Sequence, residues 1–144
     1  MARLQIFLAA LWWGSITTVG FMVVPMLFVY LETPAIAGQM AAKLFSAQTW
    51  LAVACGVLLL LAAKRQNLDR VHAPSPWVIA GMLLALLIEL AVKPHIMARD
   101  NMAVWHNLGT AFYVLQWLCA GKVLWALSAM KREPAITAGP VQTD

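Results

Sequence analysis

Four long runs of apolar residues dominate the pattern along the chain, with short polar segments between them. A helix that crosses a membrane needs roughly 20 consecutive, mostly apolar residues. Three of the runs reach this length outright, and the remaining one does so if Lys93 to Ile96 lies at the headgroups. The pattern predicts an all-α integral membrane protein, folded as an antiparallel bundle of four transmembrane helices in a single domain over residues 1–132. The predicted helices cover about residues 4–30, 38–63, 77–98 and 102–130.

The composition supports a membrane environment and excludes much else. Of the 144 residues, 62% are hydrophobic and 11% are charged, whereas a soluble domain carries about 25% charged residues. A chain of this length holds one domain, which leaves no room for a separate soluble catalytic module. The two cysteines, Cys55 and Cys119, lie inside apolar runs, so we expect small buried residues rather than a disulfide. Gly56 and Gly81 each lie four residues from an alanine, a spacing that favours close helix packing in lipid.

Lysine and arginine are distributed unevenly between the two ends of the predicted bundle. The end with both termini carries Arg3, Lys64, Arg65, Arg70, Lys131 and Arg132, and the other end carries Lys43, Lys93 and Arg99. Because basic residues concentrate in cytoplasmic loops, the count predicts cytoplasmic N- and C-termini, with 133–144 as a disordered cytoplasmic tail. Basic residues dispersed at helix ends fit contact with the lipid bilayer and do not indicate nucleic-acid binding. The sequence leaves open whether the protein is a homo-oligomer.

Glu89 is the polar residue that most needs an explanation. It lies twelve residues after Trp77, or about 18 Å along a helix, which places it inside the hydrocarbon. A carboxylate at this depth is costly unless it is protonated, paired or turned into the bundle. One interpretation is a proton or cation site. The other is a structural polar group hydrogen-bonded to Gln48 or to a hydroxyl of the first helix, namely Ser15, Thr17 or Thr18.

A second polar cluster lies at the predicted turn near residues 100 and 101. Folding the hairpin there brings His95 and His106 level, with Met97 and Met102 on either side of the turn. Imidazole and thioether ligands suit Cu(I) or haem iron, so His95 and His106 are candidate metal ligands. The alternative is that these histidines are ordinary residues of the membrane interface. The sequence has no HExxH, no CxxC and no glycine loop for phosphate, so no standard enzyme is indicated.

Two segments carry a resemblance to a known family. They are Val24-Pro25-Met26-Leu27-Phe28-Val29-Tyr30-Leu31 and Ala37-Gly38-Gln39-Met40-Ala41-Ala42-Lys43-Leu44-Phe45. Read as P-x-LF-x-x-L and AG-x-x-A-x-x-LF, they resemble the transmembrane protein 205-like family, whose bacterial members form domain of unknown function 4149. The resemblance implies a four-helix protein of the bacterial inner membrane without an established biochemical activity.

The first helix is also similar to four-helix, haem-dependent protoporphyrinogen oxidases and to copper-resistance membrane domains. It departs from the oxidase pattern, because it has no histidine and Met26 occupies the place of an arginine. Two hypotheses follow. The first is a non-enzymatic membrane module that binds a small molecule, a lipid or a partner between its helices. The alternative is a haem- or copper-binding membrane protein.

The family motif also predicts an architectural feature. Pro25 lacks a backbone N–H, so the first helix is expected to kink there. Phe28 and Phe45 are then expected to pack together across the turn after the first helix, with Gly38 between them in the sequence. The motif residues Pro25, Phe28, Gly38 and Phe45 would act as a clamp that fixes the angle between the first two helices. The alternative is a binding role for the kink.

Overall fold

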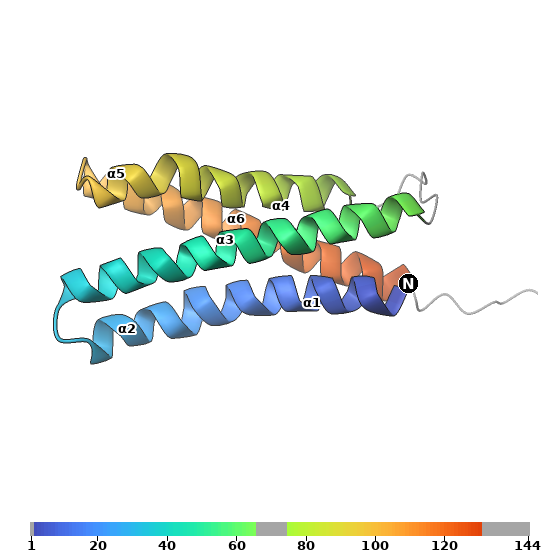
Figure 1. Cartoon of the computed structure of the whole chain (residues 1–144), viewed down its shortest axis with the longest axis horizontal. Helices are drawn as coiled ribbons and strands as arrows, with labels where there is room; N and C mark the ends of the chain where they lie inside the picture. The colour runs from blue at the N-terminus through green and yellow to red at the C-terminus, as the bar shows by residue number, and fades with distance from the viewer. Residues whose placement is uncertain (1, 66–74, 131–144) are drawn as a thin grey trace, which may run out of the picture.

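The computed structural model describes residues 2–65 and 75–130, and the regular elements in these ranges are all helices (Figure 1). Successive spans run in opposite directions, which confirms the predicted all-α four-helix bundle. The predicted tail, residues 133–144, lies outside the described residues. The four spans that are long and apolar enough to cross a membrane are Ala2–Tyr30, Pro34–Arg65, Ser75–Met97 and Met102–Ala129.

The first and third spans are each built from three consecutive helical segments, whereas the second and fourth are single helices. The elements, in chain order, are α1 (Ala2–Thr18), the π-helical turn η1 (Val19–Val23), α2 (Val24–Tyr30), α3 (Pro34–Arg65), α4 (Ser75–Leu87), the π-helical turn η2 (Ile88–Val92), α5 (Lys93–Met97) and α6 (Met102–Met130). The predicted bounds of the first, third and fourth helices agree with these to within two residues.

The second helix, α3, begins at Pro34, four residues before its predicted start. The backbone N–H of Ile36 donates to Oγ1 of Thr33 at 3.3 Å, so the threonine caps the first turn. Proline suits the next position, because the N–H that it lacks would be unpaired there in any case. Gly38 therefore lies inside the helix rather than at its start.

Both segmented spans contain a π-helical turn that ends two residues before a proline. Pro25 is the second residue of α2, after η1, and Pro94 is the second residue of α5, after η2. Proline cannot donate to the preceding turn and its ring crowds that turn. In a π turn the hydrogen bonds reach one residue further, which widens the helix locally. The predicted break at Pro25 takes this form, and its counterpart before Pro94 was not predicted from the sequence.

The half of the bundle that holds the N-terminus and the end of α6 is tightly packed, and we call it the core half. Trp12 and Ile16 of α1 are fully buried there. Glycines allow the close approach of neighbours: a Cβ atom at Gly81 would lie 2.7 Å from the ring of Trp12, and one at Gly56 would lie 2.3 Å from the sulfur of Met82. Small residues therefore set the helix spacing in this half.

The opposite half, which holds the turns at 31–33 and 98–101, is arranged differently, and we call it the cavity half. There α2 packs on α3 and α5 packs on α6, and Figure 1 shows the α2–α3 end diverging from the α5–α6 end. No residue of η1, α2 or α5 is buried. The divergence of these two helix pairs creates the candidate functional site.

Candidate functional site

A cavity of about 640 Å³ lies in the cavity half and is lined by residues of all four spans. The lining is mainly apolar and includes Phe21, Phe28, Phe45, Val92, Met102 and Val114. Its polar and charged side chains come mostly from the third and fourth spans, and they include Glu89, Lys93, Arg99, His106, Thr110 and Tyr113. The cavity thus combines an apolar body with a few polar groups, the usual make-up of a small-molecule site.

Tyr113 marks the inner end of the cavity, toward the core half. Its hydroxyl donates to the backbone carbonyl of Ile16 at 2.8 Å. Its ring lies so close to η1 that a Cβ atom at Gly20 would be 2.3 Å from a ring carbon. The ring of Phe45 meets Tyr113 edge-on, with centroids 5.2 Å apart. These contacts join α6 to the first and second spans and close the cavity at that end.

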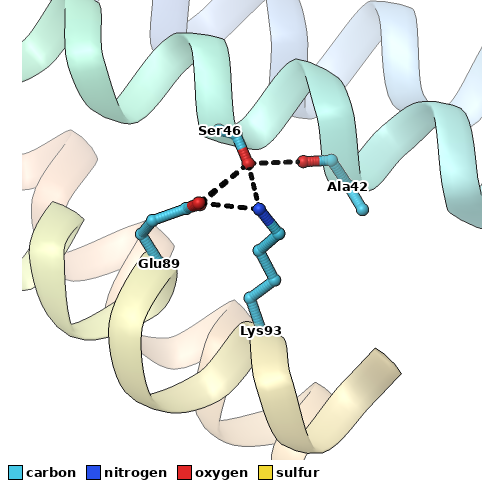
Figure 2. A network of polar contacts seen from close by, with 4 residues as sticks. All are labelled: Ala42, Ser46, Glu89 and Lys93. Atoms are coloured by element: carbon cyan, nitrogen blue, oxygen red, sulfur yellow. Dashed lines mark hydrogen bonds and ion pairs between the residues drawn. The ribbon is translucent and has the colours of Figure 1, made fainter. Parts of the chain in front are cut away.

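Glu89, Lys93 and Ser46 form a polar network at the side of the cavity (Figure 2). Nζ of Lys93 lies 2.7 Å from Oε1 of Glu89 in an ion pair, and it also donates to Oγ of Ser46. Oγ of Ser46 lies 2.9 Å from Oε2 of Glu89 and 3.0 Å from the carbonyl of Ala42. A hydroxyl has one hydrogen, so it donates to one of these two acceptors at a time.

The π turn and the start of α5 bring this pair together. Glu89 belongs to η2, and Lys93, four residues later, opens α5. An acidic residue four positions before a basic one is a favourable helical pair. The side chain of Glu89 is 14% exposed and that of Lys93 is 32% exposed, so both reach the edge of the cavity. A carboxylate is tolerated at this depth because a cation and a hydroxyl compensate it.

Gln48 does not belong to this network, contrary to the sequence-based prediction. Its Nε2 donates to Oγ of Ser15 at 3.1 Å. Gln48 and Ser46 are two positions apart, or about 200° around a helix, so they face different neighbours. Gln48 therefore faces α1, and Ser46 faces the third span.

The other first-helix hydroxyls also have partners of their own. Oγ1 of Thr17 accepts a hydrogen bond from Nε1 of Trp117 at 2.9 Å, and Thr18 donates to the carbonyl of Gly14 at 2.9 Å. Hydroxyl bonds to the preceding turn are common in membrane helices and satisfy the hydroxyl locally. None of the three predicted hydroxyls contacts Glu89 among the described residues. The interpretation of Glu89 as a proton or cation site stays a prediction.

The network contains a serine beside a lysine, a pair that acts in some hydrolases. Two features argue against such chemistry here. The ammonium of Lys93 is paired with Glu89, and a paired ammonium has no lone pair with which to accept the serine proton. Ser46 also lies within α3, where backbone N–H groups are used by the helix and cannot form an oxyanion hole. The three side chains form a fixed polar group at the side of the cavity, in which Glu89 and Lys93 compensate each other's charge.

The two predicted metal ligands lie in different surroundings. His106 lines the cavity, together with Met97 and Met102. The ring of His95 instead stacks on Trp105, with centroids 3.8 Å apart, and its Nδ1 lies 2.8 Å from the carbonyl of Ala91. In the part of the chain that the structure describes, no group of three or more His, Cys, Asp and Glu could hold a metal ion. Metal binding by His95 and His106 stays a prediction.

The predicted clamp between Phe28 and Phe45 is wrong in its central contact. Phe28 is 52% exposed, and no aromatic contact joins the two rings in the described chain, where Phe45 packs on Tyr113 instead. The early start of α3 explains this, because it places Phe45 about three turns beyond Pro34. Phe28 lies near the end of α2, so the rings are at different depths. Phe28, Gly38 and Phe45 do share one role, since all three line the cavity.

Most cavity residues were not predicted as site residues, and three of them are informative: Lys93, Arg99 and Tyr113. The signal for Lys93 was present in its spacing from Glu89. Arg99 has a backbone φ of 58°, a conformation that is uncommon for a residue other than glycine, and a sequence carries no clear sign of it. The position of Tyr113 in the cavity depends on how α6 packs on η1. The periodicity of an almost wholly apolar helix does not predict that packing.

Four membrane-spanning helices in an antiparallel bundle define a small multi-pass membrane protein. A family profile described as "Domain of unknown function (DUF4149)" matches residues 7–104. The chain belongs to this family, as the motif resemblance indicated. Comparison with curated proteins gave no match, and neither did comparison with solved structures.

Proposed function

We propose that this protein is a non-enzymatic membrane module that binds a lipid or a lipid-like small molecule in the cavity between its helices. The cavity carries this proposal. Its volume of about 640 Å³ lies within the roughly 300–1,000 Å³ of typical ligand sites. Its mainly apolar lining suits an acyl or other hydrocarbon group, and its few polar residues lie mostly on the third and fourth spans and the turn between them.

The packing around the cavity supports a ligand site over loose packing. Helix bundles in lipid are stabilised chiefly by close contact between helices, and the core half shows that this sequence achieves such contact. The cavity half departs from it through structured features: two π turns, and the ring of Tyr113 held against Gly20. π turns recur at functional sites in other helices. The ordered polar network gives the cavity a defined chemical character.

The proposed setting is the bacterial inner membrane, with both termini in the cytoplasm. Six basic residues at the termini end against three at the other support this orientation. The cavity then lies in the outer half of the membrane. We also propose a relationship to the wider transmembrane protein 205-like family, which rests on the segments around Pro25 and Gly38.

Gly38 offers a direct test, because a Cβ atom built there has no neighbour within 4 Å and the residue lines the cavity. Gly38→Phe should fill the cavity without a clash. Gly14 is the matched control: it also lies within a helix, also has no neighbour within 4 Å, and is not part of the cavity. Native mass spectrometry should show lipid or another small molecule on the wild type and on Gly14→Phe, and much less on Gly38→Phe. Equal adduct levels on all three proteins would contradict the proposal.

The alternative function is binding of copper or haem, and one observation supports it. Two thioethers and one imidazole, from Met97, Met102 and His106, line the same cavity, and this is a donor set that Cu(I) accepts. Adding Cu(I) or haem to the purified protein tests this function. Stoichiometric binding that His106→Ala abolishes and His95→Ala reduces would support the predicted pair, and binding unaffected by either variant would exclude it.

A further inference from the structure

Among the charged side chains that line the cavity, the basic groups outnumber the acidic ones. The lining contains one carboxylate, Glu89, and two basic side chains, Lys93 and Arg99, among the residues described. Glu89 is matched by its ion pair with Lys93. Arg99 has no ion pair or hydrogen bond from its guanidinium within the described chain. The mainly apolar cavity therefore carries at its turn end a cation, the exposed Arg99, that has no charged partner among the described residues.

Lys93 also retains capacity for a further hydrogen bond. Its ammonium has three donors, and the structure uses two of them, toward Oε1 of Glu89 and Oγ of Ser46. Because the side chain is 32% exposed at the cavity, the third N–H is free to meet a ligand. Glu89 and Ser46 then act as positioning residues that hold the ammonium at the side of the cavity.

Arg99 lies two residues beyond the end of α5, at the turn end of the cavity. Its backbone N–H donates to the carbonyl of Ile96 at 3.1 Å, and its φ of 58° places it in the left-handed region. A non-glycine residue in this region carries a modest energetic cost. The surrounding turn holds Arg99 in this conformation, and the residue forms part of the cavity lining.

From these observations we infer that the ligand of the cavity is an anionic amphiphile, with a hydrocarbon chain in the apolar part and a carboxylate or phosphate headgroup held by Lys93 and Arg99. This inference rests on the proposed function and names its ligand class. Arginine binds such headgroups through paired, charge-assisted hydrogen bonds, and lysine adds a point charge. The one carboxylate of the described lining, Glu89, is already paired with Lys93, so no free anion there meets a cationic headgroup.

The dimensions of the cavity agree with one medium-length chain. Its lining on α6 extends from Met102 to Val114, twelve positions or about 18 Å along the helix. Arg99 and His106 lie toward the turn, and Tyr113 lies at the inner end. The headgroup would therefore be near the membrane surface at the turn end, with the chain directed toward Tyr113 and Phe45.

The test compares ligands that share one chain length and differ in headgroup charge. Wild-type protein in nanodiscs of zwitterionic phosphatidylcholine, at about pH 8 where a carboxylate is ionised, is titrated with dodecanoate, dodecyl phosphate, dodecanol and dodecyltrimethylammonium. Ligands that bind the folded state raise its unfolding temperature with concentration. Gly38→Phe, whose cavity is filled, reports the effect of each compound on the bilayer alone.

We expect dodecanoate or dodecyl phosphate to act at a concentration about tenfold lower than dodecanol, because a charge-assisted hydrogen bond contributes that much. Arg99→Gln should remove most of this preference and retain binding of dodecanol. The double variant Glu89→Gln/Lys93→Gln should do the same, and it does not leave the carboxylate of Glu89 in the membrane without its cation. Lys43→Gln is the matched control, since Lys43 is exposed on α3 and is not part of the lining.

The outcomes separate the inference from the proposed function. Equal action of dodecanoate, dodecyl phosphate and dodecanol, or stronger action of dodecyltrimethylammonium, would overturn the anionic ligand and leave the cavity as a binding site. A preference for anions that survives in Arg99→Gln and in the double variant would overturn the assignment of the headgroup site. If no compound distinguishes the wild type from Gly38→Phe, the proposed function fails as well.

Discussion

The core half and the cavity half are built from the same four spans, but the helices pack closely in the first and diverge in the second. In the core half, glycines at positions 56 and 81 let large side chains fit against neighbouring backbones, and Trp12 is fully buried. In the cavity half, a π turn precedes each of two prolines, the helix pairs diverge and no residue of α2 or α5 is buried. The core half therefore provides the close packing, and the cavity half holds the proposed binding site.

The largest expected difference between the halves concerns aromatic side chains. Trp12→Ala removes a fully buried ring and should lower the free energy of unfolding by about 3–5 kcal/mol. Phe28→Ala removes a ring that is 52% exposed and should cost only about 0.5 kcal/mol. Reversible unfolding in mixed micelles measures both. Similar losses at the two positions would mean that the halves do not differ in packing.

The next effect concerns the polar network. Glu89→Lys places a second cation near Lys93 and removes its partner, at a cost of about 2.5–3.5 kcal/mol for an uncompensated lysine inside a membrane. The yield of membrane-inserted protein should fall. Glu89→Gln is the control, because its amide can still bond to Ser46 and Lys93, and it should insert like the wild type. A normal yield and stability of Glu89→Lys would show that position 89 faces water.

Glycine substitutions should have opposite signs in the two halves. Gly81→Ala brings a Cβ atom to 2.7 Å from the ring of Trp12, and such overpacking costs about 1–3 kcal/mol. Gly38→Ala meets no neighbour within 4 Å and should stabilise α3 by about 0.5–1 kcal/mol, because alanine favours helix more than glycine does. The same unfolding measurement applies. Destabilisation by Gly38→Ala would place that residue in a tight contact.

The smallest expected effect distinguishes the two interpretations of Phe45. A double-mutant cycle with Phe45→Ala and Tyr113→Ala should show a coupling of about 0.5–1.5 kcal/mol, as expected for an edge-on aromatic pair. The cycle with Phe45→Ala and Phe28→Ala should be additive to within about 0.5 kcal/mol. Coupling in the second cycle and additivity in the first would restore the clamp between Phe28 and Phe45.

The sequence predicted the features that depend on composition and short range spacing. Four apolar runs gave the spans, and the small residues Gly56 and Gly81 gave the close contacts of the core half. Thr33 followed by Pro34 is also a recognisable pattern for the start of a helix, and a start at Pro34 is consistent with Phe45 packing on Tyr113 rather than on Phe28. The four-residue spacing of Glu89 and Lys93 also indicates that the two side chains can pair on one face of a helix.

Other features depend on how one helix is rotated against another, and a uniformly apolar sequence does not encode this visibly. Ser46 and Gln48 are both polar residues of α3, and nothing local tells which of them faces Glu89. The cavity arises from the divergence of helix pairs after two π turns, and a proline alone does not distinguish a π turn from a simple kink. The unusual φ of Arg99 is likewise a property of the folded turn.

Thiol labelling tests most directly the claim that the cavity half is an accessible binding site and the core half is closed. The native thiols provide an internal control, since Cys55 and Cys119 are both buried in the folded protein. We predict that N-ethylmaleimide leaves both native thiols unmodified, labels Gly38→Cys readily, and labels it much more slowly when dodecanoate is present. Labelling of Gly14→Cys should not respond to dodecanoate. If the new thiol at position 38 is as unreactive as Cys55, or if dodecanoate does not protect it, the account of the cavity is contradicted.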